Sequence, residues 1–544
     1  MAKIGYLCRS KDNFKNVPLI SVRRLKFSFE VQLVVITLIN LLQAGYTGLL
    51  KDEAYYAYFA KDIQWGYFDH PPLVALLAIP STFDGLGVLG VRFLSVLSVS
   101  FSYWLLYQTL SREAKERVSN GLFSMLLLGL PLVNLYGFLT LPDTGTLLFT
   151  SLFLYAYKQF LSGSKYAVLI LGLAMAGLMY SKYTGVLIII GVIASNPRLI
   201  RDSSAWKSVI LSLLIFSPHL LWLSQNEWVT LRFHFSERPN HAYEFFPFTG
   251  GFFLNAIAIF GLFFFDFYRA LFSTTLKETF ERGLRFMVWI VLVFFFLSSF
   301  SKKSQLQWLI PVVYPLLLIF IEKPLSIKET KRIKRLGLLS IALIFSLRFL
   351  MAFEQLSPIH LEPHGVKEWS RKISTIANGK PVLFIDSYQR AALYEFYSRE
   401  IGLSYNTLDY RPNQYDFDTR WTSINKDSVF VISSKPYNFK KHIDSPKKGN
   451  LFWSSTNYLD LILPEEVVID SKNVSFTRAL PGKLYLAELD QYRRSQKIIE
   501  LKVKENEPAS IPAINQAYPF YRLGISSPGL PPRIIHKFAQ PSRP

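Results

Sequence analysis

Long apolar runs separated by short polar loops fill the first two thirds of the chain. The first run, residues 29–50, can cross a bilayer, which takes about 20 apolar residues, and lacks the cleavage site of a signal peptide. Residues 73–88 are less apolar and are interrupted by Pro80, so we expect a re-entrant or interfacial segment there. The remaining runs lie at 89–110, 118–140, 144–161, 166–180, 183–196, 206–224, 249–272, 286–300, 306–321 and 336–353. The pattern predicts a polytopic α-helical membrane protein with about eleven to thirteen transmembrane helices.

The composition changes after residue 353, where the long apolar runs stop. Short strand-like segments follow at 381–385, 428–432 and 483–487, with helical patterns between them at 366–378 and 389–397. Residues 506–544 are rich in proline and serine and are expected to form an irregular tail. The predicted organisation is therefore an N-terminal tail over 1–28, a membrane domain over 29–353 with an extracytoplasmic loop over 51–88, and a soluble α/β domain over 354–544.

The charges indicate how this chain is oriented. The formal net charge is +21, and the lysines and arginines lie between apolar runs, which favours contact with anionic membrane lipid and argues against a nucleic-acid partner. The basic residues before the first run predict a cytoplasmic N-terminus. With an odd number of membrane crossings, the loop at 51–72 and the soluble domain both lie on the extracytoplasmic side of the membrane. Cys8 is the single cysteine, so no intrachain disulfide can form.

The loop at 51–72 contains more acids and tyrosines than a connection between helices requires. Asp52 and Glu53 could simply favour the dipole at a helix N-terminus, or they could include a catalytic carboxylate. Because adjacent side chains on a helix diverge, we expect Asp52 to face a cavity and Glu53 to be structural. Asp69 and His70 precede two prolines that stiffen them; they form either a capped turn or a second carboxylate and a donor to phosphate.

Three later positions could join the same site. Asp143 follows Pro142 at the outer end of an apolar run, where it could be a helix cap or a further cavity acid. Lys182 and the pair Lys302 and Lys303 are either snorkelling cations or ligands for the phosphate of a lipid-linked donor. Gln305, Gln307 and Trp308 would then line the same pocket. No phosphate-binding glycine loop is visible, so direct use of a nucleotide is unsupported.

These residues resemble a known family. Asp52-Glu53-Ala54-Tyr55-Tyr56, followed by Gly66-Tyr67-Phe68-Asp69-His70-Pro71-Pro72, resembles the first extracytoplasmic loop of bacterial family 39-like glycosyltransferases of the GT-C fold. That group is related to protein O-mannosyltransferases and to the lipid A aminoarabinose transferase. The ordered match continues with Pro142-Asp143-Thr144, Ser181-Lys182-Tyr183-Thr184, Gln307-Trp308, Asp386-Ser387-Tyr388-Gln389 and Arg411-Pro412-Asn413-Gln414-Tyr415-Asp416. The chain differs from the aminoarabinose transferase pattern at Asp69-His70 and at Tyr55, so the transferred sugar stays open.

The resemblance implies a hexosyl- or pentosyltransferase that moves a sugar, with inversion, from a polyprenyl-phosphate (undecaprenyl-phosphate) carrier. Lipid A or another envelope glycolipid would be the acceptor, on the periplasmic side of the bacterial inner membrane. The candidate catalytic residues are Asp52, Glu53 and Asp143. The candidate contacts to donor and acceptor are Tyr55, Tyr56, Asp69, His70, Lys182, Tyr183, Lys302, Lys303, Gln307 and Trp308. No cofactor is certain; a divalent cation is left open, with Asp69 as its ligand.

Two other functions fit part of the pattern. A protein O-glycosyltransferase would share the donor and differ only in the acceptor. A lipid transporter or flippase would share the apolar runs, but such proteins more often keep functional charges at mid-membrane depth and show repeated halves. Here the acids gather at one face and no repeat is apparent, which favours the enzyme.

Overall fold

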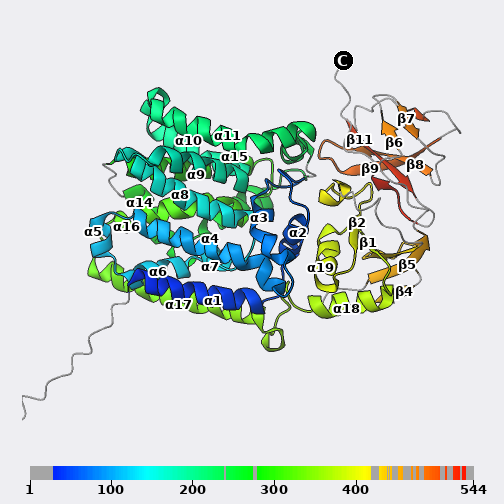
Figure 1. Ribbon diagram of the computed structural model, residues 1–544, viewed down its shortest axis with the longest axis horizontal. Coiled ribbons are helices and arrows are strands. Elements are labelled where there is room, and N and C mark those ends of the chain that lie inside the picture. Colours follow the sequence, from blue (N-terminus) through cyan, green and yellow to red (C-terminus); the bar gives the residue numbers. More distant parts are fainter. Residues whose placement is uncertain are drawn as a thin grey trace, which may run out of the picture.

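Two parts of different architecture make up the protein (Figure 1). The computed structural model describes residues 28–237, 240–273, 278–417, 428–437, 439, 441–443, 451–457, 467–469, 473–476, 483–502, 509–510, 519–526 and 530–534. Among the described residues, the regular elements up to residue 352 are helices, and strands begin at residue 382. The predicted N-terminal tail and Cys8 lie outside the described residues.

The helical part is a bundle in which the long helices lie side by side (Figure 1). Helix α4 packs between α1 and α8, α9 packs between α8 and α11, and α10 packs on α15. The helices are α1 Phe29–Tyr46, α2 Lys51–Phe59, α3 Leu73–Ala78, α4 Gly87–Thr109, α5 Arg112–Arg117, α6 Asn120–Gly129, α7 Pro131–Tyr136, α8 Pro142–Leu161, α9 Ala167–Ser181, α10 Val186–Ser195, α11 Ser203–Gln225, α12 Val229–Arg232, α13 Gly251–Ala258, α14 Phe264–Ser273, α15 Thr279–Ser298, α16 Val313–Glu322 and α17 Ile327–Ala352. The predicted apolar runs therefore all fold as helices.

Fewer helices cross a bilayer unbroken than the eleven to thirteen expected. Among the described residues, α1, α4, α11 and α17 are long and apolar enough, and the segments 246–258 and 261–273 make a fifth span if their 91° bend is counted as one crossing. The other runs are interrupted: Pro131 starts α7 directly after α6, and Lys182 separates α9 from the short helix that leads into α10. Outward-facing leucines such as Leu42, Leu214 and Leu338 are more than half exposed, as contact with lipid requires.

The α/β domain begins with a five-stranded sheet in the order β2-β1-β3-β5-β4. Its strands are β1 Val382–Ile385, β2 Gly402–Tyr405, β3 Ser428–Ser433, β4 Lys441–Ile443 and β5 Leu451–Asn457. Strand β1 runs parallel to β2 and β3, and the connection from β1 to β2 is helix α19, Tyr388–Ser398. Helix α18, Val366–Ala377, packs against α19. The predicted strands at 381–385 and 428–432, and both predicted helices, are confirmed.

The prediction of an irregular tail over 506–544 is wrong. Strand β11, Phe520–Ser526, pairs antiparallel with β8, Lys483–Leu489, along its whole length. Prolines and serines on both sides of β11 dominate the local composition, which hides a seven-residue strand. The second sheet has the order β12-β11-β8-β9, with β9 Ser495–Leu501 and β12 Arg533–Ile534. A third sheet has the order β10-β7-β6, with β6 Val467–Ile469, β7 Asn473–Phe476 and β10 Ala509–Ser510.

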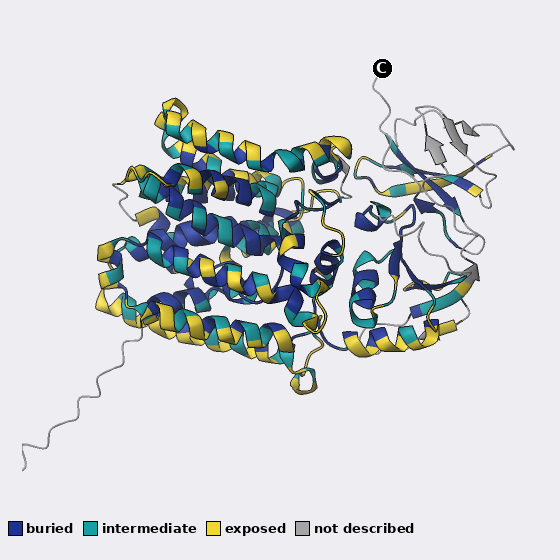
Figure 2. Ribbon diagram, viewed as in Figure 1, coloured by how far each residue is buried: buried dark blue, intermediate teal, exposed yellow. Residues whose placement is uncertain are grey.

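Helix α2 is the main contact between the two parts of the protein. It packs against α19 of the α/β domain, and the two helices share one cluster of buried apolar side chains. Figure 2 shows buried residues along the middle of the bundle and at this contact, with exposed residues along the outer faces of α1, α11 and α17. Helix α2, at the start of the loop, therefore lies between the membrane helices and the α/β domain.

Candidate active site

The first turn of α2 directs its two acids in different directions. Glu53 reaches back to the start of the helix, where its carboxylate accepts a hydrogen bond from the Leu50 N–H at 3.0 Å. This capping contact stabilises the N-terminal end of the helix. Asp52, one residue earlier, opens onto the cavity described below. The expected division of roles, with one acid in the cavity and one inside the fold, matches this placement.

Glu53 is fully buried and holds three segments of the bundle together. Its carboxylate accepts hydrogen bonds from the Arg92 guanidinium at 2.7 and 2.5 Å and from the Thr140 N–H at 3.0 Å. Arg92 in turn donates to the carbonyl oxygens of Ala44 and Thr47. Both carboxylate oxygens of Glu53 are engaged and the residue does not line the cavity, so the structure places this catalytic candidate inside the fold, contrary to the sequence prediction.

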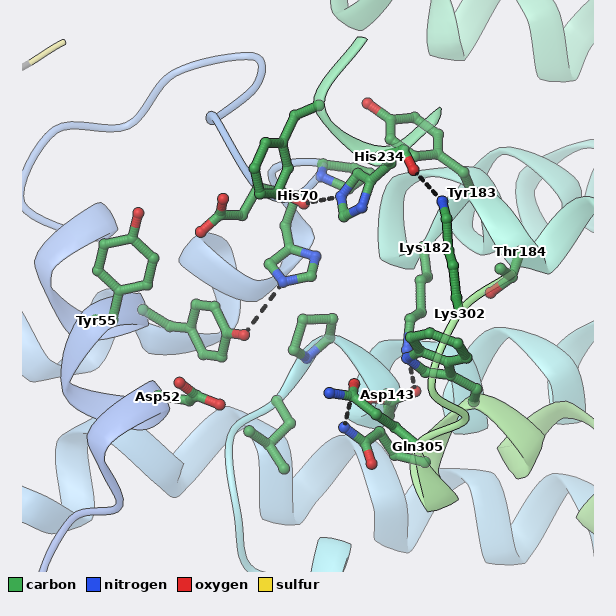
Figure 3. Close-up of a pocket in the computed structure, with 18 of the residues that line it drawn as sticks. Asp52, Tyr55, His70, Asp143, Lys182, Tyr183, Thr184, His234, Lys302 and Gln305 are labelled. Atoms are coloured by element: carbon green, nitrogen blue, oxygen red, sulfur yellow. Dashed lines mark hydrogen bonds and ion pairs between the residues drawn. The ribbon is translucent and has the colours of Figure 1, made fainter. Parts of the chain in front are cut away.

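A cavity of about 560 Å³ lies where the helical bundle meets the α/β domain. Figure 3 shows Asp52 and Tyr55 on one side of it, Lys182, Tyr183 and Lys302 on the other, and Asp143 near Gln305. The sequence-predicted residues that line it are Asp52, Tyr55, Tyr56, Asp69, His70, Asp143, Lys182, Tyr183, Lys302, Gln305, Gln307 and Trp308. Asp52 and Trp308, which are 256 positions apart in the sequence, thus line the same cavity.

Each of the three sequence-predicted acids that line the cavity has a short contact to a partner side chain. Asp143 pairs with the Lys182 ammonium at 2.9 Å, and Asp69 pairs with the Arg411 guanidinium at 2.6 Å. Asp52 accepts a hydrogen bond from the amide of Gln389 at 2.7 Å. Among these three, Asp52 is therefore the acid whose direct partner is neutral; Glu362, a further acid in the lining, accepts a hydrogen bond from the Lys51 N–H at 2.7 Å.

The surroundings of Asp52 make its charged form less favourable than in water. Burial against the cavity wall raises the pKa of its carboxyl, and the Gln389 hydrogen bond lowers it. The nearby carboxylates of Glu362 and Asp69 also raise this pKa, so that the net pKa lies above the ordinary value of 3.8. Arg411 behaves in the opposite way. Burial, the largest single influence, lowers the pKa of its guanidinium, but the Asp69 carboxylate together with Tyr388, Tyr55 and Tyr410 outweighs burial, and the net pKa is raised.

Two histidines and a lysine form a second polar wall. The Tyr56 hydroxyl lies 3.3 Å from Nε2 of His70, and Nε2 of His234 donates to the Asp69 carbonyl oxygen at 2.8 Å (Figure 3). The Lys302 ammonium donates to the carbonyl oxygen of His234. Lys303 does not line the cavity: its ammonium lies 5.9 Å from the centre of the Phe248 ring. The structure therefore places this candidate outside the cavity, contrary to the sequence prediction.

The Asp143 carboxylate is not the cap of helix α8. The helix starts after Leu141, and Asp143 lies inside its first turn, almost fully buried, with its side chain directed to Lys182. Tyr183, the residue after Lys182, hydrogen bonds to Nε2 of His219 at 2.8 Å. Nδ1 of His219 faces the Trp65 carbonyl oxygen at 2.6 Å and must donate to it, so the Tyr183 hydroxyl is the donor to Nε2.

The lining residues to which sequence reasoning gave no role include His234, Glu362, Gln389 and Arg411. Gln389 and Arg411 stand in segments that carried the family resemblance, which was the signal available. Their partners Asp52 and Asp69 are 337 and 342 residues away in the chain. Only the docking of the α/β domain on α2 brings them together.

Asp69, the candidate ligand for a divalent cation, is neutralised by Arg411. Within the described ranges, no three side chains of His, Cys, Asp or Glu gather in a geometry that could hold a metal ion. A cation at Asp69 would first have to displace the Arg411 guanidinium. Metal binding at Asp69 stays a prediction.

Comparison with known proteins supports the resemblance seen in the loop. The family model of dolichyl-phosphate-mannose-protein mannosyltransferases matches residues 69–222. No curated protein matches the chain by sequence. Two solved structures of ArnT from Cupriavidus metallidurans superpose on this chain, each with a TM-score of 0.55 at 14% identity and each over 78% of this chain. One is in the apo state, and 97% of its chain is covered; the other is bound to undecaprenyl phosphate, and 98% of its chain is covered. The resemblance to GT-C glycosyltransferases of the ArnT and protein mannosyltransferase type is therefore confirmed.

Proposed function

We propose that this chain transfers a sugar from an undecaprenyl-phosphate-type carrier to lipid A or another envelope glycolipid. The ArnT structure of the same fold that binds undecaprenyl phosphate supports the donor class. The cavity supports the chemistry, because its cations and acids line one chamber beside the membrane helices. The membrane domain over 29–353 would hold the lipid tail, and the α/β domain from residue 354 would stand on the periplasmic side.

The donor phosphate would lie against the basic wall of the cavity. Lys182, Lys302 and His70 line this wall, and ammonium and imidazole groups suit a phosphate because each donates hydrogen bonds to its oxygens. Neutralising the phosphate makes it a better leaving group. When the bond between the anomeric carbon and the phosphate oxygen breaks, both bonding electrons go to the phosphate.

The observation that carries this proposal is the neutral partner of Asp52. Asp69 and Asp143 are tied to cations, whereas Asp52 receives one amide hydrogen bond and has a raised pKa. A carboxylate of higher pKa is a stronger base. With a hydroxyl acceptor, Asp52 takes its proton while the acceptor oxygen attacks the anomeric carbon opposite the phosphate. This single displacement inverts the configuration.

A phosphate acceptor changes the proton balance. An ionised phosphate oxygen attacks the anomeric carbon directly, and no proton is removed. Asp52 would then orient the sugar and balance the positive charge that develops on its ring in the transition state. Tyr55 and Tyr56 line the same side of the cavity and could hydrogen bond to the sugar hydroxyls.

Asp52→Asn tests the proposal because it keeps the shape of the side chain and removes its charge. Purified protein would be given a radiolabelled undecaprenyl-phosphate sugar and total envelope lipid, and the label transferred to lipid counted. We expect a loss of about 10² to 10⁴-fold. Asp62→Asn, an exposed acid at the end of the same segment, is the matched control and should transfer normally. Transfer by the Asp52→Asn protein at the wild-type rate would contradict the assignment.

A protein acceptor is the second candidate, favoured by the mannosyltransferase family model that matches residues 69–222. Mass spectrometry of lipid A and of secreted proteins from a deletion strain separates the two. Loss of one sugar mass from lipid A supports the glycolipid acceptor. Loss of that mass from secreted proteins supports O-glycosylation.

A further inference from the structure

Two side chains of the α/β domain reach into the cavity and each holds one acid of the membrane part. The Gln389 amide donates to Oδ1 of Asp52 at 2.7 Å, and the Arg411 guanidinium pairs with Asp69 at 2.6 Å. We propose that Gln389 is a positioning residue that fixes the Asp52 carboxylate toward the substrate, so that the α/β domain completes the catalytic centre. This inference rests on the proposed function of the cavity.

The position of Gln389 is fixed because α19 is held along the length of α2. At the far end of this contact, the Lys61 ammonium pairs with Glu395 of α19 at 2.7 Å. At the near end, the ring centres of Tyr55 and Tyr388 lie 4.5 Å apart. Gln389 is the next residue after Tyr388, so its amide cannot move far from Asp52 without disrupting this packing.

Loop 410–417 of the α/β domain adds a second attachment to the same helix. The Gln414 N–H donates to the Tyr55 hydroxyl at 2.7 Å, and the Tyr415 ring stacks on Tyr58 with centres 4.2 Å apart and planes within 7°. The side chain of Gln414 also accepts from the Phe68 N–H at 2.7 Å. Asp52 and Asp69 of loop 51–72 are thus held against fixed parts of the α/β domain.

The hydrogen bond has two consequences for Asp52. It occupies Oδ1 and leaves Oδ2 as the oxygen available to the acceptor. It also stabilises the charged form of the carboxyl, whose pKa is raised by burial and by the carboxylates of Glu362 and Asp69 and lowered by Arg411. The tyrosines that interact electrostatically with Asp52 are Tyr56, Tyr136 and Tyr388. Removing the amide donor should therefore raise the pKa of Asp52 further.

Three variants separate positioning from simple docking. Gln389→Met keeps the length of the side chain and removes the donor, and Gln389→Glu places a second carboxylate beside Asp52. Arg399→Met is the matched control: it removes another contact between the two parts, the exposed Arg399–Asp84 pair at 3.0 Å, which lies outside the cavity. The Arg399→Met control should have the kcat and the Asp52 pKa of the wild-type protein.

We expect kcat to fall about tenfold or more in Gln389→Met, and further in Gln389→Glu, with little change in the KM for the donor. The apparent pKa of Asp52 should rise in the same order, by about half a unit or more. Infrared difference titration measures this pKa without turnover, with Asp52→Asn protein identifying the carboxyl band. Equal Asp52 pKa values in wild-type and Gln389→Met proteins, or an equal fall in kcat for Arg399→Met, would overturn the inference.

The same measurements distinguish this inference from the proposed function. If wild-type protein transfers no sugar but the Asp52 band still shifts in Gln389→Met, the function is wrong and the positioning contact is real. If wild-type protein is active and the band does not shift, the function stands and the positioning role fails.

Discussion

Asp52 is the residue on which the pH dependence of the reaction should depend. A general base must be deprotonated, and the raised pKa of Asp52 puts its titration above that of an ordinary aspartate. The rate with a hydroxyl acceptor should therefore fall as the pH falls through this raised pKa. A pH profile of kcat checks this, and the acid limb should be absent from the residual activity of Asp52→Asn protein. A wild-type profile without this limb would contradict the role of Asp52 as a general base.

Glu53 should affect the stability of the fold and not the chemistry. Its carboxylate and the Arg92 guanidinium are completely buried, and removing one partner of such a pair leaves the other charge uncompensated. Glu53→Gln should lose about 3–5 kcal/mol of stability. Thermal unfolding in detergent measures this loss. Asp52→Asn protein, altered at the adjacent position, should unfold near the wild-type temperature.

Replacing Lys182 and replacing Lys303 should affect donor binding differently, although both lysines lie in short breaks between helices. Lys182 lines the cavity beside Asp143, whereas Lys303 lies over Phe248. Lys182→Met should raise the KM for the lipid-linked donor about tenfold, because a phosphate contact is lost. Lys303→Met should leave it unchanged. Initial rates at varied donor concentration test the pair, and similar effects of both changes would contradict this assignment.

At the scale of the elements, the apolar pattern predicted where helices form but not where they break. The runs 89–110 and 206–224 correspond to the unbroken helices α4 and α11, and α11 continues through Pro218 although proline lacks a backbone N–H. The run 118–140 divides at Pro131, whose ring starts a new helix. Strand β11 was missed because its seven residues are flanked by prolines, and its pairing with β8 is a tertiary contact.

Strand β11 also braces the loop that carries Arg411. The buried Arg522 guanidinium donates to the carbonyl oxygens of Leu408 at 3.0 Å and of Tyr410 at 2.8 Å. Arg522→Ala should destabilise this loop by about 1–3 kcal/mol, since two buried acceptors lose their donor. Limited proteolysis near residue 410 and the sugar-transfer rate measure the effect. The exposed Arg494→Ala change, which removes only a local pair with Asp490, should leave both unaltered.

At the scale of the whole molecule, the sequence predicted the membrane acids and cations but not the contribution of the α/β domain. Asp52, Asp69 and Asp143 stand out because acids at the ends of apolar runs need an explanation. Gln389 and Arg411 stand in a domain where glutamine and arginine are ordinary surface residues. They matter because the α/β domain docks on the loop at 51–72 and so brings together residues more than 330 positions apart in the sequence. No local sequence pattern predicts this contact.

The orientation of the molecule can be tested with matched single cysteines in a Cys8→Ser background. Ile376 is exposed on α18 of the α/β domain, and Ile327 is exposed at the start of α17, in a basic stretch expected to face the cytoplasm. A membrane-impermeant maleimide added to cells with an opened outer membrane should label Ile376→Cys and spare Ile327→Cys until the inner membrane is lysed. Because the α/β domain forms one wall of the cavity, labelling of Ile376→Cys also locates the acids. The reverse pattern would put them in the cytoplasm, where a periplasmic acceptor could not reach them.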